Sequence, residues 1–158
     1  MATNKRSQLL ATFAQTPTTL TRLTASLEDK ILDSRSAPDE WSIREILAHL
    51  VDDEMFVMRT RLERMIKEDS PHLVSNDEKR WYSQRNTARD GINELLQDFA
   101  IQRTASQNIL TFLREEEWSR EAYHPEIGQI TVEALLTYWV EHDLVHIQQI
   151  EHNLAGAR

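Results

Sequence analysis

The sequence predicts an all-α fold, a four-helix bundle, from three observations. Glycine occurs 3 times and proline 4 times in 158 residues, too few for the many tight turns of an all-β sandwich. Apolar residues recur at spacings of three and four along four segments, as on the buried face of an amphipathic helix. Polar connections rich in turn-forming residues separate these segments. At this length we expect one domain over residues 1–158 with its own hydrophobic core.

The first predicted helix covers residues 7–29, where five leucines and Phe13 form an apolar stripe. Pro17 lies inside this segment and cannot donate the helical hydrogen bond. We therefore expect Pro17 to kink the helix or to divide it.

The second predicted helix covers about residues 42–67 and has a strong start signal. Ser42 precedes the apolar run and Glu45 follows three residues later, which is the arrangement of a capping box. The apolar stripe of this helix continues through either Phe56 or Val57.

A long connection joins the second helix to the third. Residues 68–87 lose the apolar period and contain Pro71, so they read as a connection, with a short helical turn expected around Trp81. The third helix then begins near Thr87 or Ala88 and ends after Leu113.

The fourth predicted helix follows a second connection, which contains His124 and Gly128. Thr131 is placed to cap its start, and Glu133 is one of the acidic residues favoured in a first helical turn. The helix then continues to about Leu154.

The connection lengths predict the topology. A helix of about 25 residues is about 37 Å long, and a connection of about 20 residues can span that distance in extended form. Helices two and three can therefore run parallel, joined by a long crossover. Together with the histidine positions below, this predicts an up-down-down-up bundle.

Charge and residue types exclude several classes of protein. The net charge of −8 makes nucleic acid an unfavourable partner, and no apolar run is long enough to cross a membrane. The sequence contains no cysteine, so a metal has only histidine and carboxylate ligands to choose from. The first residues lack an apolar signal segment, so we expect a cytoplasmic protein.

His142 and His146 are the first candidates for chemistry. They are four residues apart, which places both imidazoles on one face of the fourth helix and suits a shared metal ion. Such a pair on an acidic helix is, however, more often solvated surface. His49 on the second helix lies at a matching height if helices two and four are antiparallel. His72 and His152 are expected at the surface, and His124 is expected at the opposite end of the bundle from His49.

The sequence resembles the DinB-like superfamily of metal-dependent four-helix-bundle proteins over nearly the whole chain, and three features carry the resemblance. They are Trp41-Ser42 before the second helix, His49 followed by an acidic run, and the HxxxH pair of the fourth helix followed by Gln148-Gln149. The resemblance implies an up-down-down-up bundle and a divalent ion, often zinc or nickel, bound by His49, His142 and His146. Because thiol-dependent transferases belong to this superfamily, it also implies a possible low-molecular-weight thiol as cosubstrate.

Three histidine ligands leave at least one coordination position open, as in catalytic sites. We expect a metal-dependent enzyme acting on a small molecule, with transfer of a thiol to an electrophile ranked first. The alternatives are a metal-dependent hydrolase of a small molecule, or a dimeric module that binds a metal or ligand without catalysis. A di-iron centre is excluded because it needs two Glu-x-x-His motifs and the sequence has one, Glu121 to His124, and a zincin is excluded because HExxH is absent.

Four further residues are candidates to support the site. Asp52 and Asp53 follow His49 by three and four residues and could accept its second ring N–H, although a solvated acidic face is an equal alternative. Gln149 and Tyr138 continue the face of the histidine pair and could orient substrate, with core packing the other role for Tyr138. The resemblance and an expected exposed Trp81 also suggest a homodimer.

Overall fold

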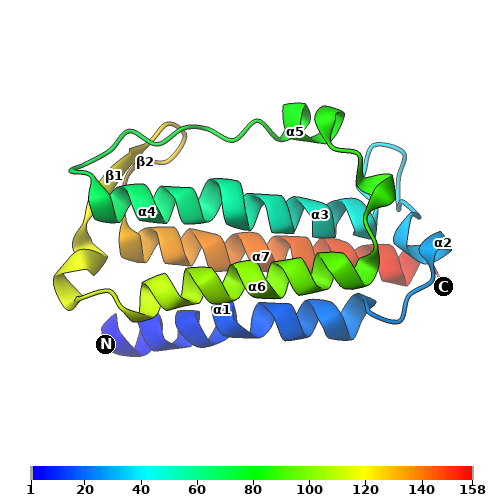
Figure 1. The fold of residues 1–158 in the computed structure, drawn as a ribbon, viewed down its shortest axis with the longest axis horizontal. Helices are drawn as coiled ribbons and strands as arrows, with labels where there is room; N and C mark the ends of the chain where they lie inside the picture. Colours follow the sequence, from blue (N-terminus) through cyan, green and yellow to red (C-terminus); the bar gives the residue numbers. More distant parts are fainter. Residues whose placement is uncertain (1, 158) are drawn as a thin grey trace.

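The computed structural model describes residues 2–157 and contains four long helical rods (Figure 1). The second rod is continuous but has three parts, because one π-helical turn interrupts it between two α-helices. The rods are α1 (Ala2–Thr24), α3 with η1 and α4 (Ile43–Asp53, Glu54–Met58 and Arg59–Lys67), α6 (Ile92–Thr111) and α7 (Val132–Gly156).

The predicted up-down-down-up topology is confirmed. Figure 1 shows α1 and α7 running in one direction and the α3–α4 rod and α6 in the other. Residues 68–91 return along the outside of the α3–α4 rod as the predicted crossover. The expected turn around Trp81 is α5 (Glu78–Gln84), and η2 (Thr87–Arg89) follows it. A crossover of this kind is what makes two consecutive rods parallel.

Both predicted helix caps are present. The Ser42 side chain accepts a hydrogen bond from the backbone N–H of Glu45 at 3.2 Å. The Thr131 side chain accepts one from the N–H of Ala134 at 3.1 Å. The second half of the predicted capping box is replaced, since Glu45 bonds to Arg35 instead. These caps set where the two histidine-bearing helices begin.

The first rod differs from its prediction at both ends. It begins at Ala2 and ends at Thr24, where residues 7–29 were expected, and a separate short helix, α2 (Asp29–Leu32), follows. Pro17 lies inside α1 without dividing it. Phe13 and Leu20 flank the proline and are fully buried, so packing against the other rods offsets the missing hydrogen bond.

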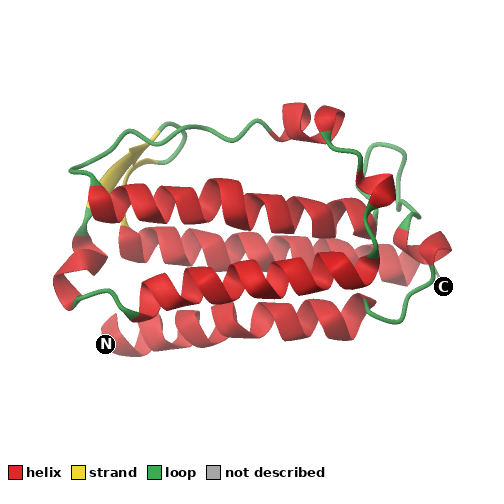
Figure 2. Cartoon of the chain, in the orientation of Figure 1, coloured by secondary structure: helices red, strands yellow, loops and turns green. Residues whose placement is uncertain are grey.

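A β-hairpin was not predicted and lies between α6 and α7, after the 3₁₀ turn η3 (Glu115–Ser119) (Figure 2). Its strands are β1 (Glu121–His124) and β2 (Gly128–Thr131), paired antiparallel. Tyr123 in β1 also exchanges backbone hydrogen bonds with the crossover at Pro71 and Leu73, at 2.9 and 2.8 Å. The hairpin therefore holds the start of the crossover against the bundle.

The π-helical turn explains which of two alternatives the second rod buries. Phe56 is 65% exposed and Val57 is partly buried, while Met58 is 1% exposed. A π turn contains more residues than an α turn, so it shifts the apolar stripe along the sequence.

None of the helices in the described part of the chain combines the length and the apolar character that a membrane crossing requires.

Candidate metal centre

Three histidines from two antiparallel helices converge inside the bundle. His49 comes from α3, and His142 and His146 come from successive turns of α7. One ring nitrogen from each lies within 4.8 Å of the other two. The two Nε2 atoms of the α7 pair are 3.2 Å apart. The three histidines that the sequence suggested as partners therefore lie together in the structure.

All three imidazoles are held in the neutral form. Burial, and then the neighbouring His146, lowers the pKa of His49 to about 3. Burial and then the other two histidines lower the pKa of His142 far below its ordinary value. Burial also lowers the pKa of His146, against the opposing effect of a hydrogen bond to Gln149. Neutral imidazole is the form that binds a metal ion.

The geometry fits a divalent ion in two respects. Nitrogen ligands of a tetrahedral zinc ion lie about 3.4 Å apart when each Zn–N distance is about 2.1 Å, close to the spacing of the α7 pair. In addition, Nε2 of His49 is buried and has no hydrogen-bond partner among residues 2–157. A buried ring nitrogen without a partner is costly, and a metal ion is one way to satisfy it.

Asp53 lies closer to the cluster than its neighbour Asp52. Oδ2 of Asp53 is 3.1 Å from Nε2 of His142, and its Oδ1 accepts a 3.0 Å hydrogen bond from Asn76. Burial raises the pKa of Asp53 to about 7, against an opposing effect of Arg61. Asp52 instead accepts hydrogen bonds from Trp81 and Arg85, at 2.7 and 2.9 Å, and so fastens the crossover to α3.

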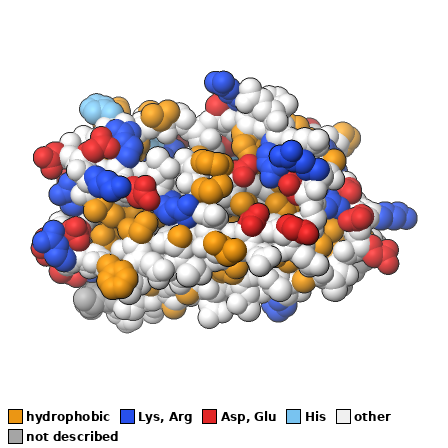
Figure 3. All heavy atoms as spheres, in the orientation of Figure 1, with side chains coloured by type: hydrophobic (Ala, Val, Ile, Leu, Met, Phe, Trp, Pro, Cys, Tyr) orange, Lys and Arg blue, Asp and Glu red, His pale blue; other side chains and the backbone are white. Residues whose placement is uncertain are grey.

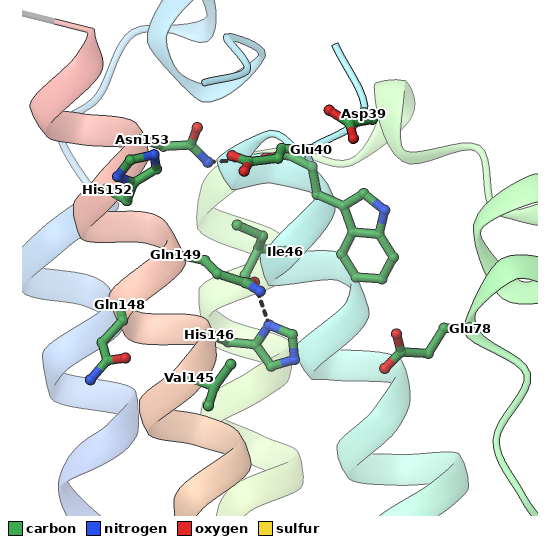
Figure 4. Close-up of a pocket in the computed structure, with 11 residues that line it drawn as sticks. Asp39, Glu40, Ile46, Glu78, Val145, His146, Gln148, Gln149, His152 and Asn153 are labelled. Atoms are coloured by element: carbon green, nitrogen blue, oxygen red, sulfur yellow. Dashed lines mark hydrogen bonds between the residues drawn. The ribbon is translucent and has the colours of Figure 1, made fainter. Parts of the chain in front are cut away.

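Gln149 and Tyr138 occupy different parts of the site. Oε1 of Gln149 is 2.8 Å from Nδ1 of His146 (Figure 4), while Nε2 of the same ring lies 3.2 Å from Nε2 of His142. The contact assigns the proton of His146 to Nδ1. Tyr138 is 36% exposed and its ring centroid lies 6.3 Å from that of His124.

The crossover and Trp41, the residue before the Ser42 cap, form an aromatic and acidic wall over His49. The rings of Trp41 and Trp81 lie 5.0 and 5.3 Å from the His49 ring. Oε1 of Glu78, at the start of α5, is 3.8 Å from Nε2 of His49. The expectation that Trp81 is exposed is wrong: the side chain is partly buried, because its ring packs on Trp41 and its indole N–H bonds to Asp52.

Two cavities adjoin the histidines of the cluster. The first, of about 470 Å³, is lined by His146, Gln149, Trp41 and Glu78 among others (Figure 4). The second, of about 580 Å³, is lined by His142, Asp53, Arg61 and His124 among others. Glu78 lines both. A small molecule in either cavity would therefore lie beside a histidine of the cluster.

The hairpin that carries His124 lies at the end of the bundle where α7 begins, as expected (Figure 1). His124 nevertheless lines the second cavity, which His142 also lines. The sequence did not predict this shared cavity, because the segment was interpreted as a simple connection. His72 and His152 are exposed as expected, although His152 lines the first cavity.

A buried ionic network lies directly behind the cluster and was missed at the sequence level. Arg103 from α6 is fully buried and forms paired hydrogen bonds with Glu54 and with Asp143, at 2.6 to 3.1 Å. Trp139 also donates to Glu54 at 2.8 Å. Glu54 begins η1 directly after Asp53, and Asp143 follows His142, so the network holds the second rod, α6 and α7 together at the level of the site.

Similar proteins share this fold. YfiT of Bacillus subtilis (strain 168), a candidate metal-dependent hydrolase, is 26% identical over 150 residues, 92% of this chain and 82% of YfiT. OB0413 of Oceanobacillus iheyensis, described in the same terms, is 26% identical over 144 residues, 84% of this chain and 77% of that protein. The solved YfiT structure, reported to have an unusual four-helix-bundle topology, superimposes with a TM-score of 0.88 at 21% identity, covering 97% of this chain and 87% of YfiT.

A family model supports the resemblance expected from Trp41-Ser42, His49 and the HxxxH pair. The model describes the DinB superfamily and matches residues 12–150, which include all three histidines of the cluster. The chain belongs to the DinB superfamily.

Proposed function

We propose that this protein is a divalent-metal-dependent hydrolase of small molecules, with His49, His142 and His146 as the metal ligands. The observation that supports this most is the convergence of three neutral imidazoles between two cavities. The candidate hydrolases among the relatives favour hydrolysis over the thiol transfer that the sequence alone ranked first. Zinc and nickel are the ions to test first.

Each protein group has a defined task in this proposal. A bound divalent ion supplies an acidified water and polarises a substrate carbonyl. Gln149 holds the Nδ1 proton of His146, so that Nε2 stays free for the ion. Asp53 presents a carboxylate 3.1 Å from His142, on the side of the second cavity, and is the nearest group that can accept a proton from an attacking water. Asn76 keeps that carboxylate in place.

The wall over His49 limits the access of water and substrate. Trp41 and Trp81 cover the ring of His49, and Asp52 fixes Trp81 through its indole N–H. Substrate therefore has to approach through the two cavities, beside His146 or beside His142.

The test is turnover of 4-nitrophenyl acetate by the protein loaded with zinc or with nickel. We expect hydrolysis that requires the metal, that is lost in His146→Ala, and that survives in His72→Ala, an exposed histidine that lines neither cavity. Parallel assays offer cysteine or glutathione with 1-chloro-2,4-dinitrobenzene. Metal-dependent thiol turnover without ester hydrolysis would replace this proposal by thiol transfer. Stoichiometric metal with neither activity would favour a binding module.

A further inference from the structure

We propose that Arg61 and His124 form a carboxylate-binding subsite in the second cavity, so that the natural substrate carries a carboxylate group. That the bound molecule is a substrate rests on the proposed hydrolase function. The subsite itself is inferred from the residues of this cavity alone. Both residues line the cavity together with His142 and Asp53. They come from separate elements, α4 and β1, which the hairpin brings together.

Arg61 is a buried cation that forms no direct ion pair within residues 2–157, and Asp53 of the same cavity acts on it only from a distance. The residue is 6% exposed. Among the described residues its Nη atoms reach the sulfur of Met58, at 3.8 Å, and the carbonyl of Val74, at 3.2 Å. Its Nε is buried and has no hydrogen-bond partner among the described residues. A guanidinium in this situation favours an anion that can accept from it.

His124 supplies a second donor of known direction. Its Nδ1 accepts hydrogen bonds from the backbone N–H groups of Glu126 and Ile127, at 3.1 and 3.2 Å. Because Nδ1 is the acceptor, the proton of the neutral ring is on Nε2. The residue is 2% exposed, and within the described chain Nε2 has no partner. The hairpin turn thus orients an unpaired N–H donor.

A single carboxylate matches this pair of donors better than other anions. It carries one negative charge for one guanidinium, and its two oxygens can accept from Arg61 and His124 separately. Asp77, Glu78 and Glu126 also line the cavity, and only Lys79 adds a second positive charge. These acidic groups and the net charge of −8 disfavour phosphate and other multiply charged anions.

The experiment measures binding of butyrate, with butyramide and inorganic phosphate as comparison ligands. ¹⁵N-labelled full-length protein is titrated after chelator treatment and again after zinc loading, following the His124 ring nitrogens. We expect butyrate to bind in both states and to shift the Nε2 signal, with butyramide and phosphate at least about tenfold weaker.

The variants separate recognition from folding. Arg61→Gln removes the charge, and His124→Asn keeps an acceptor for the turn while removing the Nε2 donor; each should weaken butyrate binding about tenfold or more. Arg64→Gln, on the same helix, and His72→Asn are the matched controls and should bind as the parent does. Arg61→Lys retains the charge if the Gln variant unfolds, and should bind more tightly than His124→Asn.

Three results would overturn the subsite. The first is that the folded parent does not bind butyrate, and the second is that binding disappears on chelation. The third is that His124→Asn or folded Arg61→Gln binds butyrate as strongly as the parent does. Ester turnover is scored separately. Butyrate binding without any metal-dependent hydrolysis would leave the subsite standing and remove the hydrolase proposal.

Discussion

Arg103 on α6 donates a 2.6 Å hydrogen bond from Nη1 to Oδ2 of Asp143, the residue that follows His142 on α7. The same guanidinium donates to both oxygens of Glu54, the residue that follows Asp53. One buried cation therefore fixes the two backbone segments that carry a histidine and a carboxylate of the site. The other surfaces of Arg103 contact Phe13, whose ring lies 3.7 Å from the guanidinium carbon.

Replacement of Arg103 tests whether this network holds the bundle. Arg103→Met leaves Glu54 and Asp143 buried without their cation, and we expect a loss of about 3–5 kcal/mol in the free energy of unfolding. Urea denaturation followed by circular dichroism measures it. The control is Arg114→Met, whose side chain is 71% exposed, with an expected change within about 0.5 kcal/mol. Equal stability of the two variants would contradict this role.

Replacement of each cluster histidine tests the metal ligands. His49→Ala, His142→Ala and His146→Ala should each reduce bound zinc or nickel at least about tenfold, because a site built from three imidazoles loses a direct ligand. Elemental analysis after exhaustive dialysis gives the metal content. His152→Ala is the matched control on α7. Parental metal content in all three folded variants would show that the assignment is wrong.

Gln149 offers a subtler test of the same site. Gln149→Leu removes the acceptor for His146 Nδ1 while leaving all three proposed ligands, so metal affinity should fall about 10- to 100-fold. Competition with a chromogenic chelator measures the affinity. Gln148→Leu changes the neighbouring residue in the same cavity and should have little effect. If both variants bind metal as the parent does, the contact with His146 has no supporting role.

The four helices, the topology and the histidine cluster could be predicted from the sequence, because they depend on local periodicity and on the lengths of helices and connections. Ser42 and Thr131 marked helix starts directly, and the heights of His49 and His142 could be compared from the 1.5 Å rise of a helix. The hairpin could not be predicted, since its strands are only four residues long and β1 is also held by backbone hydrogen bonds from Tyr123 to the distant crossover. The position of His124 depends on that pairing.

The ionic network could not be predicted for a related reason. Arginine is usually exposed, so the sequence predicts a surface position for Arg103 on α6. Only its tertiary partners explain its burial. The π-helical turn at Glu54–Met58 likewise has no clear sequence signal. The sequence offers one hint of the burial of Arg103. Arg103 lies four residues after Phe99 and seven before Leu110, on the same face of α6 as these apolar residues.

The homodimer stays a prediction, and the exposed surface is where its contact would have to lie. Acidic and basic side chains are interspersed on the face shown in Figure 3. Trp81 no longer supports a contact surface, but Val74 and Phe112 are 75% and 83% exposed. Sedimentation equilibrium at micromolar concentration should give twice the 18.5 kDa mass of one chain. A mass of one chain over the whole concentration range would contradict the dimer.

Acidification should destabilise the metal-free protein through the buried histidines. Burial lowers the pKa of His49 from 6.5 to about 3, so between these values the unfolded chain binds a proton there that the folded chain does not. Stability therefore falls as the pH drops through this window, by about 1.4 kcal/mol per pH unit for one such group. Urea unfolding of the chelated protein from pH 6.5 to pH 5 measures the slope.

His49→Gln separates this histidine from Asp53, whose pKa of about 7 in the folded chain gives the opposite pH dependence over the same range, and from the other two buried histidines. The variant lacks the proton uptake at position 49, so its stability should depend less steeply on pH than that of the parent. His152→Gln removes an exposed histidine instead, and should keep the parental slope. Identical slopes in the parent and in His49→Gln would mean that the ring of His49 can be protonated in the folded protein, and the neutral cluster on which metal binding depends would then not exist.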